Sequence, residues 1–200
     1  MNKDFLFELY GNALKVEKTY GIPALFNVAQ AVLESGWELK PIKDCNTGKN
    51  SYNIFGIKHH GGDFVEAYTN EYSNGKWITI KARFQSYESF EKCFEDHSQL
   101  LLKPLYKPCL DEHKKTGNIV NYVKCVAKNY ATDVLYADKI LNIIETLKKY
   151  LGLEYKYEKE EAKKFVVAKG LFKPDGTEDY WTRTINREDL AVILKRLGGA

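Results

Sequence analysis

Glu34 is the residue of this 200-residue chain that is best placed for acid catalysis. It lies near the end of segment 21–37, where apolar residues recur at helical spacing, and a small-residue break and Trp37 follow it. A carboxylate in the last turn of a helix opposes the helix dipole, which tends to raise its pKa. A carboxyl that stays protonated near neutral pH beside an aromatic ring can act as the general acid that protonates a glycosidic oxygen. The alternative is a solvated surface glutamate, because helical periodicity groups Glu34 with Asn27 and Gln30, away from the apolar face.

Glu71 is a second candidate carboxylate, in a β-hairpin that we predict over residues 64–84. An Asn-Gly pair at the centre of this segment is a strong signal for a two-residue turn. With that turn, Tyr72 pairs with Trp77, and Glu71 lies opposite Ile78 on the more apolar face of the hairpin. An acidic residue on that face either meets water at a sheet edge or points into a cleft.

The elements that would hold these two carboxylates are predominantly helical. Five segments have apolar residues at helical spacing, with capping or breaking residues at their ends. They cover residues 4–19, 23–35, 86–103, 118–128 and 136–151. We therefore predict a mainly α domain (α+β) with a small β-hairpin lobe.

Five short motifs follow one another along the chain: AQAVLESGW from residue 29, YNIFGIK from 52, TNEYSNG from 69, RFQSY from 83 and NYATD from 129, the last followed by Tyr136 and Lys139-Ile140. Together they resemble the bacterial cell-wall endo-β-N-acetylglucosaminidases of glycoside hydrolase family 73, a group that includes the flagellar peptidoglycan hydrolase, autolysins and phage lysins. The similar region covers roughly residues 5–150. Val134 departs from the pattern, because the family often has a proline after Ala-Thr-Asp.

The resemblance implies a lysozyme-like helical domain whose cleft holds a glycan strand. It implies that Glu34 is the general acid, that Glu71 on the hairpin lobe is the second carboxylate, and that Tyr130 stands beside the scissile bond. Glu66 and Asp63 are the local alternatives to Glu71. The resemblance also implies substrate-binding residues around the cleft: Trp37, Asn53, Phe55, Gly56, Tyr72 and Tyr136.

The implied reaction is hydrolysis of the β-1,4 bond between N-acetylglucosamine and N-acetylmuramic acid in peptidoglycan strands. The second carboxylate would act as a nucleophile or as a base, or would be dispensable if the acetamido group of the substrate attacks, and the sequence leaves these routes open. None of them needs a metal or another cofactor. The alternatives are a muramidase or lytic transglycosylase with the same cleft, and a non-catalytic protein that binds the cell wall.

Composition sets limits on the other classes of function. The chain has 44% hydrophobic and 28% charged residues, as soluble globular proteins do, and no stretch approaches the roughly 20 apolar residues of a membrane span. Its net charge of +3 comes from interleaved acidic and basic residues, which disfavours nucleic-acid binding. The N-terminal residues lack the pattern of a signal peptide. We therefore expect synthesis in the cytoplasm, action on the bacterial cell wall and a separate route of release, such as the holin that releases a phage lysin. A signal peptide that has been removed would also explain the pattern.

The four cysteines are Cys45, Cys93, Cys109 and Cys125. They are widely spaced without a C-x-x-C pattern, so we predict free thiols that mostly fill the core. Cys93 and His97, with Cys109 and His113, have spacings that would in principle build a zinc site, but the prolines between the two pairs favour core packing. His59-His60 has no third ligand nearby and is predicted to be solvated.

The predicted domains are a catalytic domain over residues 1–152, a charged linker over 153–160 and a small helical module over 161–200. The module resembles a single S-layer-homology repeat through Asn186-Arg187-Glu188 and Arg196, with Asn in place of the usual Thr. The resemblance implies attachment to the cell wall. The alternative is a helical hairpin that stabilises the protein or forms a homo-oligomer.

Overall fold

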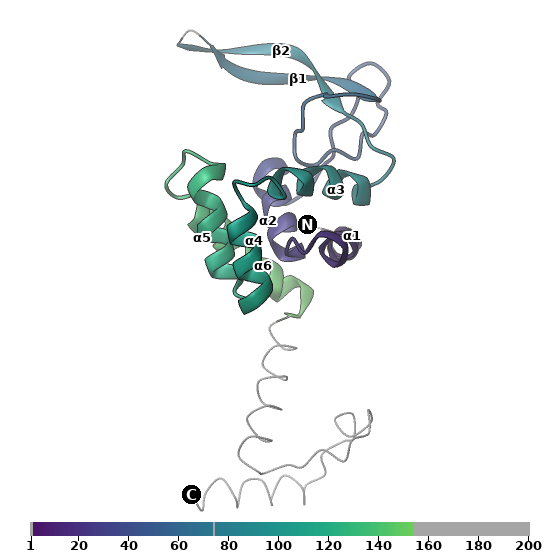
Figure 1. The fold of residues 1–200 in the computed structure, drawn as a ribbon. Coiled ribbons are helices and arrows are strands. Elements are labelled where there is room, and N and C mark those ends of the chain that lie inside the picture. The colour runs from purple at the N-terminus through teal and green to yellow at the C-terminus, as the bar shows by residue number, and fades with distance from the viewer. Residues whose placement is uncertain (1, 74, 154–200) are drawn as a thin grey trace, which may run out of the picture. The chain divides into compact units, whose positions relative to one another are not determined.

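The structure, a computed structural model, describes residues 2–73 and 75–153 (Figure 1). The chain divides into two units, Met1–Leu151 and Gly152–Ala200, and every helix and strand described below lies in the first. The predicted module over residues 161–200, with its S-layer-homology pattern and its role in oligomerisation, lies outside the described residues. So does all of the predicted linker except residue 153.

Six helices and one antiparallel hairpin make up the described domain, which confirms the mainly helical fold class with a small β-hairpin lobe. In chain order the elements are α1 (Lys3–Tyr20), α2 (Ala24–Ser35), β1 (Phe64–Ser73), β2 (Lys76–Gln85), α3 (Phe90–Leu101), α4 (Lys107–Thr116), α5 (Ile119–Tyr130) and α6 (Tyr136–Leu151). Within that part of the chain, no helix is long and apolar enough to cross a membrane.

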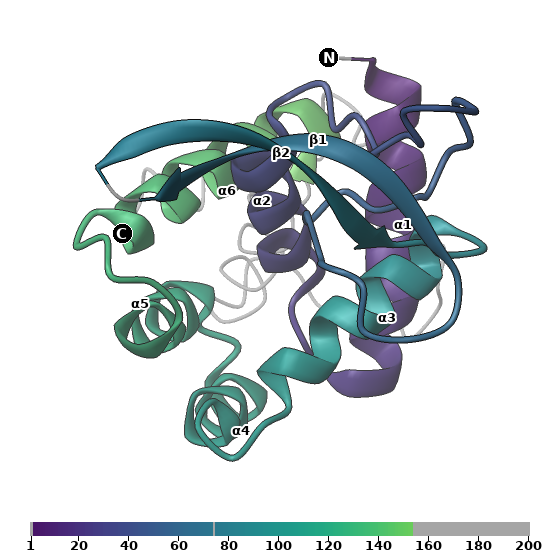
Figure 2. The same cartoon turned by 90° about the horizontal axis from the view of Figure 1, so that it is seen from above.

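Helix α2 forms the centre of the core. It packs against α1 and α6, and Figure 2 shows it enclosed by the other helices. Most of its circumference is buried, including the polar residues Asn27 and Gln30. Burial on nearly all sides is what the largely apolar sequence of α2 requires. Asn27 and Gln30, which share the polar side of the helix with Glu34, therefore lie underneath other helices, and only Glu34 at the end of that side is exposed.

The hairpin has the register that the sequence predicts. Tyr72 pairs with Trp77, and Glu71 pairs with Ile78. Since alternate residues share a face, Glu71 lies on the same side of the hairpin as Val65, which is buried at its base. Tyr72 and Trp77 lie on the opposite face and are largely exposed.

Two helices begin later than predicted. Helix α3 begins at Phe90 rather than at Ser86, because the backbone amide of Ser86 donates a hydrogen bond to the carbonyl of Asp63 and continues the hairpin. The side chain of Ser89 caps the helix instead. Helix α2 begins just after Pro23.

Helix α4 is not among the five helices predicted from the sequence. Pro108 lies in the first turn of α4, where a proline costs no helical hydrogen bond. Asn118 caps α5 as predicted, although the helix continues two residues further than expected, to Tyr130, and α6 has the predicted bounds, Tyr136–Leu151.

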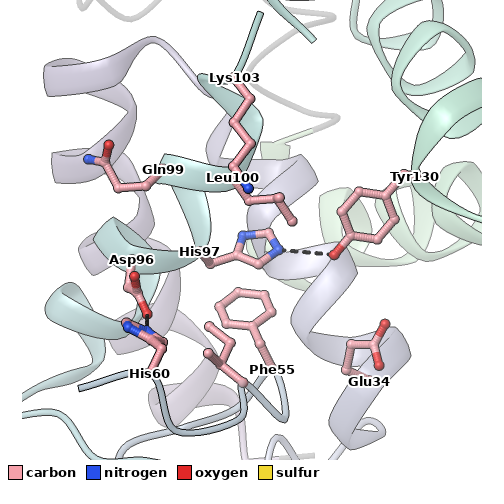
Figure 3. A pocket seen from close by; sticks show the side chains of 10 residues that line it. Glu34, Phe55, His60, Asp96, His97, Gln99, Leu100, Lys103 and Tyr130 are labelled. Atoms are coloured by element: carbon pink, nitrogen blue, oxygen red, sulfur yellow. Dashed lines mark hydrogen bonds and ion pairs between the residues drawn. The ribbon is translucent and has the colours of Figure 1, made fainter. Parts of the chain in front are cut away.

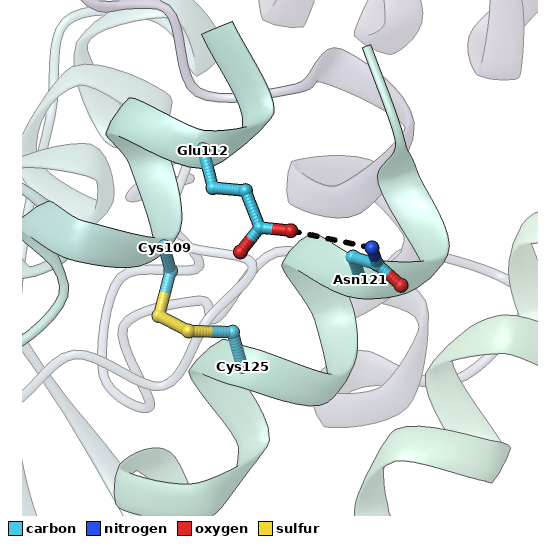
Figure 4. The surroundings of a disulfide bond; sticks show 4 residues. All are labelled: Cys109, Glu112, Asn121 and Cys125. Atoms are coloured by element: carbon cyan, nitrogen blue, oxygen red, sulfur yellow. Dashed lines mark hydrogen bonds between the residues drawn. A yellow bond between two sulfur atoms is a disulfide. The ribbon is translucent and has the colours of Figure 1, made fainter. Parts of the chain in front are cut away.

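The prediction of four free thiols is wrong for two of them. Cys109 of α4 and Cys125 of α5 form a disulfide bond, with 5.6 Å between their Cα atoms (Figure 4). The two helices lie side by side and bring together residues that no local motif links. The bond also removes Cys109 as a thiolate ligand, which contradicts the zinc alternative. Cys45 is an exposed free thiol and Cys93 a buried one.

Candidate active site

A pocket of about 440 Å³ lies where the end of α2 meets α3, the end of α5 and the loop before β1 (Figure 3). It is lined by Glu34, Phe55, Ile57, His60, Asp96, His97, Gln99, Leu100, Lys103 and Tyr130. Figure 3 shows Glu34 and Tyr130 on one side of the pocket and Asp96 with His60 on the other. Three of the residues predicted for the site, Glu34, Phe55 and Tyr130, are therefore brought together.

Glu34 lies in the last turn of α2, immediately before Ser35 and Gly36. Gly36 has a φ of 75°, a left-handed conformation that lets the chain turn away and leaves the carboxyl at the rim of the pocket. The residue as a whole is exposed, yet desolvation by the surrounding protein raises the pKa of its carboxyl above the usual range. The direction is the one predicted from sequence, but its cause is burial, whereas we had argued from the helix dipole.

Tyr130 is the last residue of α5. Its ring stacks on Tyr136 at a centroid distance of 5.4 Å. Desolvation, followed by the negative charge of Glu34 and by Tyr106, raises the pKa of its phenol to about 12. At neutral pH the pocket therefore contains a neutral Tyr130 hydroxyl whose environment includes the Glu34 carboxyl.

His97 of α3 forms the wall of the pocket between Phe55 and Tyr130. Its ring stacks on Phe55 at 3.8 Å, and its Nε2 lies 3.4 Å from the hydroxyl of Tyr130. On the other side, its Nδ1 lies 3.1 Å from Oδ1 of Asn27. From the sequence, His97 was predicted to be a core residue. A histidine on the apolar face of a helix needs polar partners, and that need is the signal that was available.

The loop that carries Phe55 is held by Asn53, which the resemblance placed in the cleft. Asn53 is buried and does not line the pocket. Its Nδ2 donates to the carbonyls of Ile57 and Gln85, and its Oδ1 accepts from the amides of Phe55 and Ile57. Gly56 is exposed with a φ of 69°, which makes the tight turn. In this structure Asn53 and Gly56 shape the loop, and Phe55 faces the pocket.

Glu71 does not line this pocket. It lies on the hairpin, where its Oε1 is 3.0 Å from Nζ of Lys58, and the carboxylate is about half exposed. Of its two alternatives, Glu66 faces the other side of the hairpin and pairs with Lys81 at 2.6 Å. Asp63 pairs with Lys49 at 2.8 Å in front of β1. Among the three, only Glu71 projects from the hairpin face that is continuous with the core.

The remaining predicted substrate-binding residues lie outside the pocket. Trp37 is partly exposed and packs near Tyr150, with 6.3 Å between ring centroids. Tyr72 faces away from Glu71 on the outer face of the hairpin. Tyr136 is buried under Tyr130, and its hydroxyl accepts a hydrogen bond of 2.7 Å from Gln30. Tyr136 therefore supports the pocket from below.

Asp96 and His60 make the far wall of the pocket and were not predicted as site residues. Asp96 accepts a hydrogen bond of 2.6 Å from the hydroxyl of Tyr87, and its Oδ2 lies 2.8 Å from Nε2 of His60. His60 thus pairs with the Asp96 carboxylate, although the sequence predicted that it is only solvated. No cluster of three His, Cys, Asp or Glu side chains suited to a metal ion occurs in the described part of the chain.

A helical domain with a hairpin lobe, and a pocket that combines a carboxyl of raised pKa with a neutral tyrosine, has the layout of a lysozyme-like glycoside hydrolase. The family model for glucosaminidase, described as mannosyl-glycoprotein endo-beta-N-acetylglucosaminidase, matches residues 10–149. The chain belongs to this glucosaminidase family, as the five motifs indicated, and its catalytic domain is a glycoside hydrolase domain.

The similar proteins carry related names. The peptidoglycan hydrolase FlgJ of Vibrio cholerae is 37% identical over 144 residues, which is 70% of this chain and 42% of FlgJ. The exo-glucosaminidase LytG of Bacillus subtilis is 32% identical over 198 residues, which is 95% of this chain and 65% of LytG. The chain thus matches only part of the length of these relatives.

The solved structures that are similar have the same overall fold. The C-terminally truncated glycoside hydrolase domain of FlgJ from Salmonella typhimurium superposes with a TM-score of 0.61 at 34% identity, covering 74% of this chain and 97% of that one. The catalytic domain of the autolysin Auto from Listeria monocytogenes gives a TM-score of 0.60 at 29% identity, covering 74% and 85%.

Proposed function

We propose that this protein hydrolyses peptidoglycan, at the β-1,4 bond between N-acetylglucosamine and N-acetylmuramic acid. The observation that carries the proposal is the position of Glu34, whose carboxyl has a raised pKa and lines a pocket next to Tyr130. The names of the relatives, peptidoglycan hydrolase and autolysin, support the choice of substrate.

In the proposed reaction Glu34 acts as the general acid. Its raised pKa keeps a larger share of the carboxyl protonated near neutral pH, so a proton is available for the glycosidic oxygen as the bond breaks. Glu71 then stabilises the positive charge on the sugar or activates water. If the acetamido group of the substrate attacks instead, no close second carboxylate is required.

Mass spectrometry of the soluble products from purified peptidoglycan tests the bond that is cut. New reducing ends on N-acetylglucosamine support the proposal. Reducing ends on muramic acid, or anhydromuramic ends, would assign the chain to the muramidase or lytic transglycosylase alternative.

Glu34→Gln distinguishes an enzyme from a wall-binding protein. The variant should bind purified wall as the wild type does and release no fragments. A matched control is Glu38→Gln, because Glu38 follows closely in the chain, is exposed, pairs with Lys40 and has a pKa lowered by that partner. Equal fragment release by wild type and Glu34→Gln would contradict the proposed role.

Exo-action is a second candidate, because the similarity to LytG, named an exo-glucosaminidase, spans 95% of this chain. The size of early products separates the two modes of action. Endo-cleavage shortens long glycan strands to intermediate lengths at once, whereas exo-cleavage releases only small units from the ends.

We also propose that the protein acts outside the cytoplasmic membrane and that residues 161–200 attach it to the wall. The disulfide between Cys109 and Cys125 supports the first point, since such bonds persist in oxidising surroundings. The second is tested by co-sedimentation with wall of the full chain and of a chain ending at residue 152. Equal binding by both would argue against attachment, and their masses in solution would show whether the C-terminal residues form an oligomer.

A further inference from the structure

A chain of buried polar groups connects helices α2, α3 and α5 behind the pocket. Nδ2 of Asn27 lies 3.2 Å from Oγ of Ser98, and Oδ1 of Asn27 lies 3.1 Å from Nδ1 of His97. Nε2 of His97 then lies 3.4 Å from the hydroxyl of Tyr130. Asn27 and Ser98 are fully buried and His97 is 4% exposed, so these groups depend on one another for hydrogen bonds.

The order of donors along this chain follows from the orientation of the Asn27 amide in the structure and from the single N–H of a neutral imidazole. Asn27 donates to Ser98 with its amide nitrogen, so it offers its oxygen to His97. An acceptor at that position requires the hydrogen of the imidazole to be on Nδ1. A neutral imidazole has one N–H, so its Nε2 is an acceptor, and the Tyr130 hydroxyl must donate to it.

The surroundings of His97 keep its ring neutral. Complete burial lowers its pKa to about 3, and the opposing influence is the negative charge of Asp96. Asp96 is itself held by the hydroxyl of Tyr87 and by His60, and Phe55 covers the ring face of His97. The ring therefore stays an acceptor at Nε2 over the whole range in which a glycosidase would work.

We propose that Asn27 and His97 are positioning residues that turn the hydroxyl hydrogen of Tyr130 toward α3, so that Tyr130 offers only its oxygen lone pairs to the substrate. This inference rests on the proposed function. Tyr130 then accepts a hydrogen bond from the substrate or from the attacking water. The Tyr130 oxygen accepts this hydrogen bond from the N–H of an acetamido group or from the O–H of a water, and the Tyr130 hydroxyl does not donate to a sugar oxygen.

The tautomer is tested directly by ¹⁵N NMR of the full chain labelled at its four histidines, with His97 assigned from the signal lost in His97→Gln. We expect a hydrogen on Nδ1 and none on Nε2 of His97 from pH 8 down to pH 5. Tyr130→Phe should shift the Nε2 signal and leave the hydrogen on Nδ1. A hydrogen on Nε2, or titration of His97 with a midpoint near 6, would overturn the proposal.

Kinetics test the consequence for turnover on soluble peptidoglycan fragments. His97→Gln keeps an acceptor near the position of Nε2 and should retain most of kcat, whereas His97→Leu removes it and should lower kcat by about 3- to 10-fold with little change in KM. In a Tyr130→Phe background the two His97 variants should have equal kcat. An equal loss from His97→Leu in both backgrounds would mean that His97 does not act through Tyr130. Because the NMR result does not depend on activity, failure of the hydrolase proposal and failure of this one are distinguishable.

Discussion

The two regions that carry the proposed catalytic carboxylates are built differently. On the helical side, Glu34 and Tyr130 project from the ends of packed helices, and hydrogen bonds from Gln30 to Tyr136 and between Tyr130 and His97 hold the neighbouring side chains. On the hairpin side, β1 and β2 pack mainly on each other, and Glu71 meets the domain through a partly exposed ion pair with Lys58. A buried network fixes side chains, whereas an exposed ion pair contributes little to stability.

This difference assigns unequal tasks to the two carboxylates. Desolvation prepares Glu34 to hold a proton before substrate arrives. Glu71 is partly solvated and paired with a lysine, so in the proposed reaction it would act as a base or stabilising charge only once bound glycan displaces the water around it. In this proposal the substrate completes the hairpin side, whereas the helical side is complete beforehand.

The largest expected effect is the loss of kcat when either of the two carboxylates is replaced. Glu34→Gln should lower kcat by about 10²- to 10⁴-fold, since it removes the proton donor. Glu71→Gln should lower kcat less, about 10- to 100-fold, because the positive charge of Lys58 already partly offsets the negative charge of Glu71. Reducing-end assays measure both, with Glu66→Gln on the other hairpin face as control. A larger loss for Glu71→Gln than for Glu34→Gln would reverse the assignment.

The next effect is on stability of the helical side. Reduction of the bond between Cys109 and Cys125, or Cys109→Ser with Cys125→Ser, should lower the free energy of unfolding by about 3 kcal/mol, the loss expected for a closed loop of 16 residues. Denaturant titration with and without reductant measures it. Cys45→Ser is the control, because this exposed thiol should leave the midpoint unchanged.

A smaller effect is expected on the hairpin side. Tyr72 and Trp77 contact edge to face at 5.4 Å and should stabilise the hairpin by about 0.2–1 kcal/mol. Trp77→Ala should raise KM a few-fold by loosening the strands that hold Glu71, with the global melting temperature unchanged. In the double variant with Tyr72→Ala the two effects should be less than additive. Full additivity would mean that the two rings act separately.

The smallest expected effect is the contribution of Glu34 to the pH dependence of the free energy of unfolding. The folded-state pKa of Glu34 is raised, so the native state holds this proton more tightly than the unfolded chain does. Its contribution to stability is therefore largest below the ordinary pKa of glutamate and is lost as pH rises through the raised value. Because the carboxyl is partly solvated, we expect a few tenths of a kcal/mol. Melting curves of Glu34→Gln and wild type should converge toward acid pH and separate in favour of the variant toward neutral pH.

Much of the fold could be predicted because local patterns encode it. The cap residue Asn118 indicated where α5 begins. The Asn-Gly pair indicated the register of the hairpin, and both signals come from neighbouring residues alone. Helix α4 was not predicted, and its early proline gives no clear signal, because proline is compatible both with a turn and with the first turn of a helix. Within the site, Glu34 was found from its position in the helix, but His97 was assigned to the core.

The sequence by itself determined five of the six described helices, the face of the hairpin that carries Glu71 and the location of Glu34 at the end of α2. These follow from periodicity and capping over a few residues. Only the tertiary structure decided that Cys109 meets Cys125 and that Asn27, His97 and Tyr130 form one chain. Such contacts join residues far apart in the sequence, and they arise only when the packing of whole helices has fixed which of their faces meet.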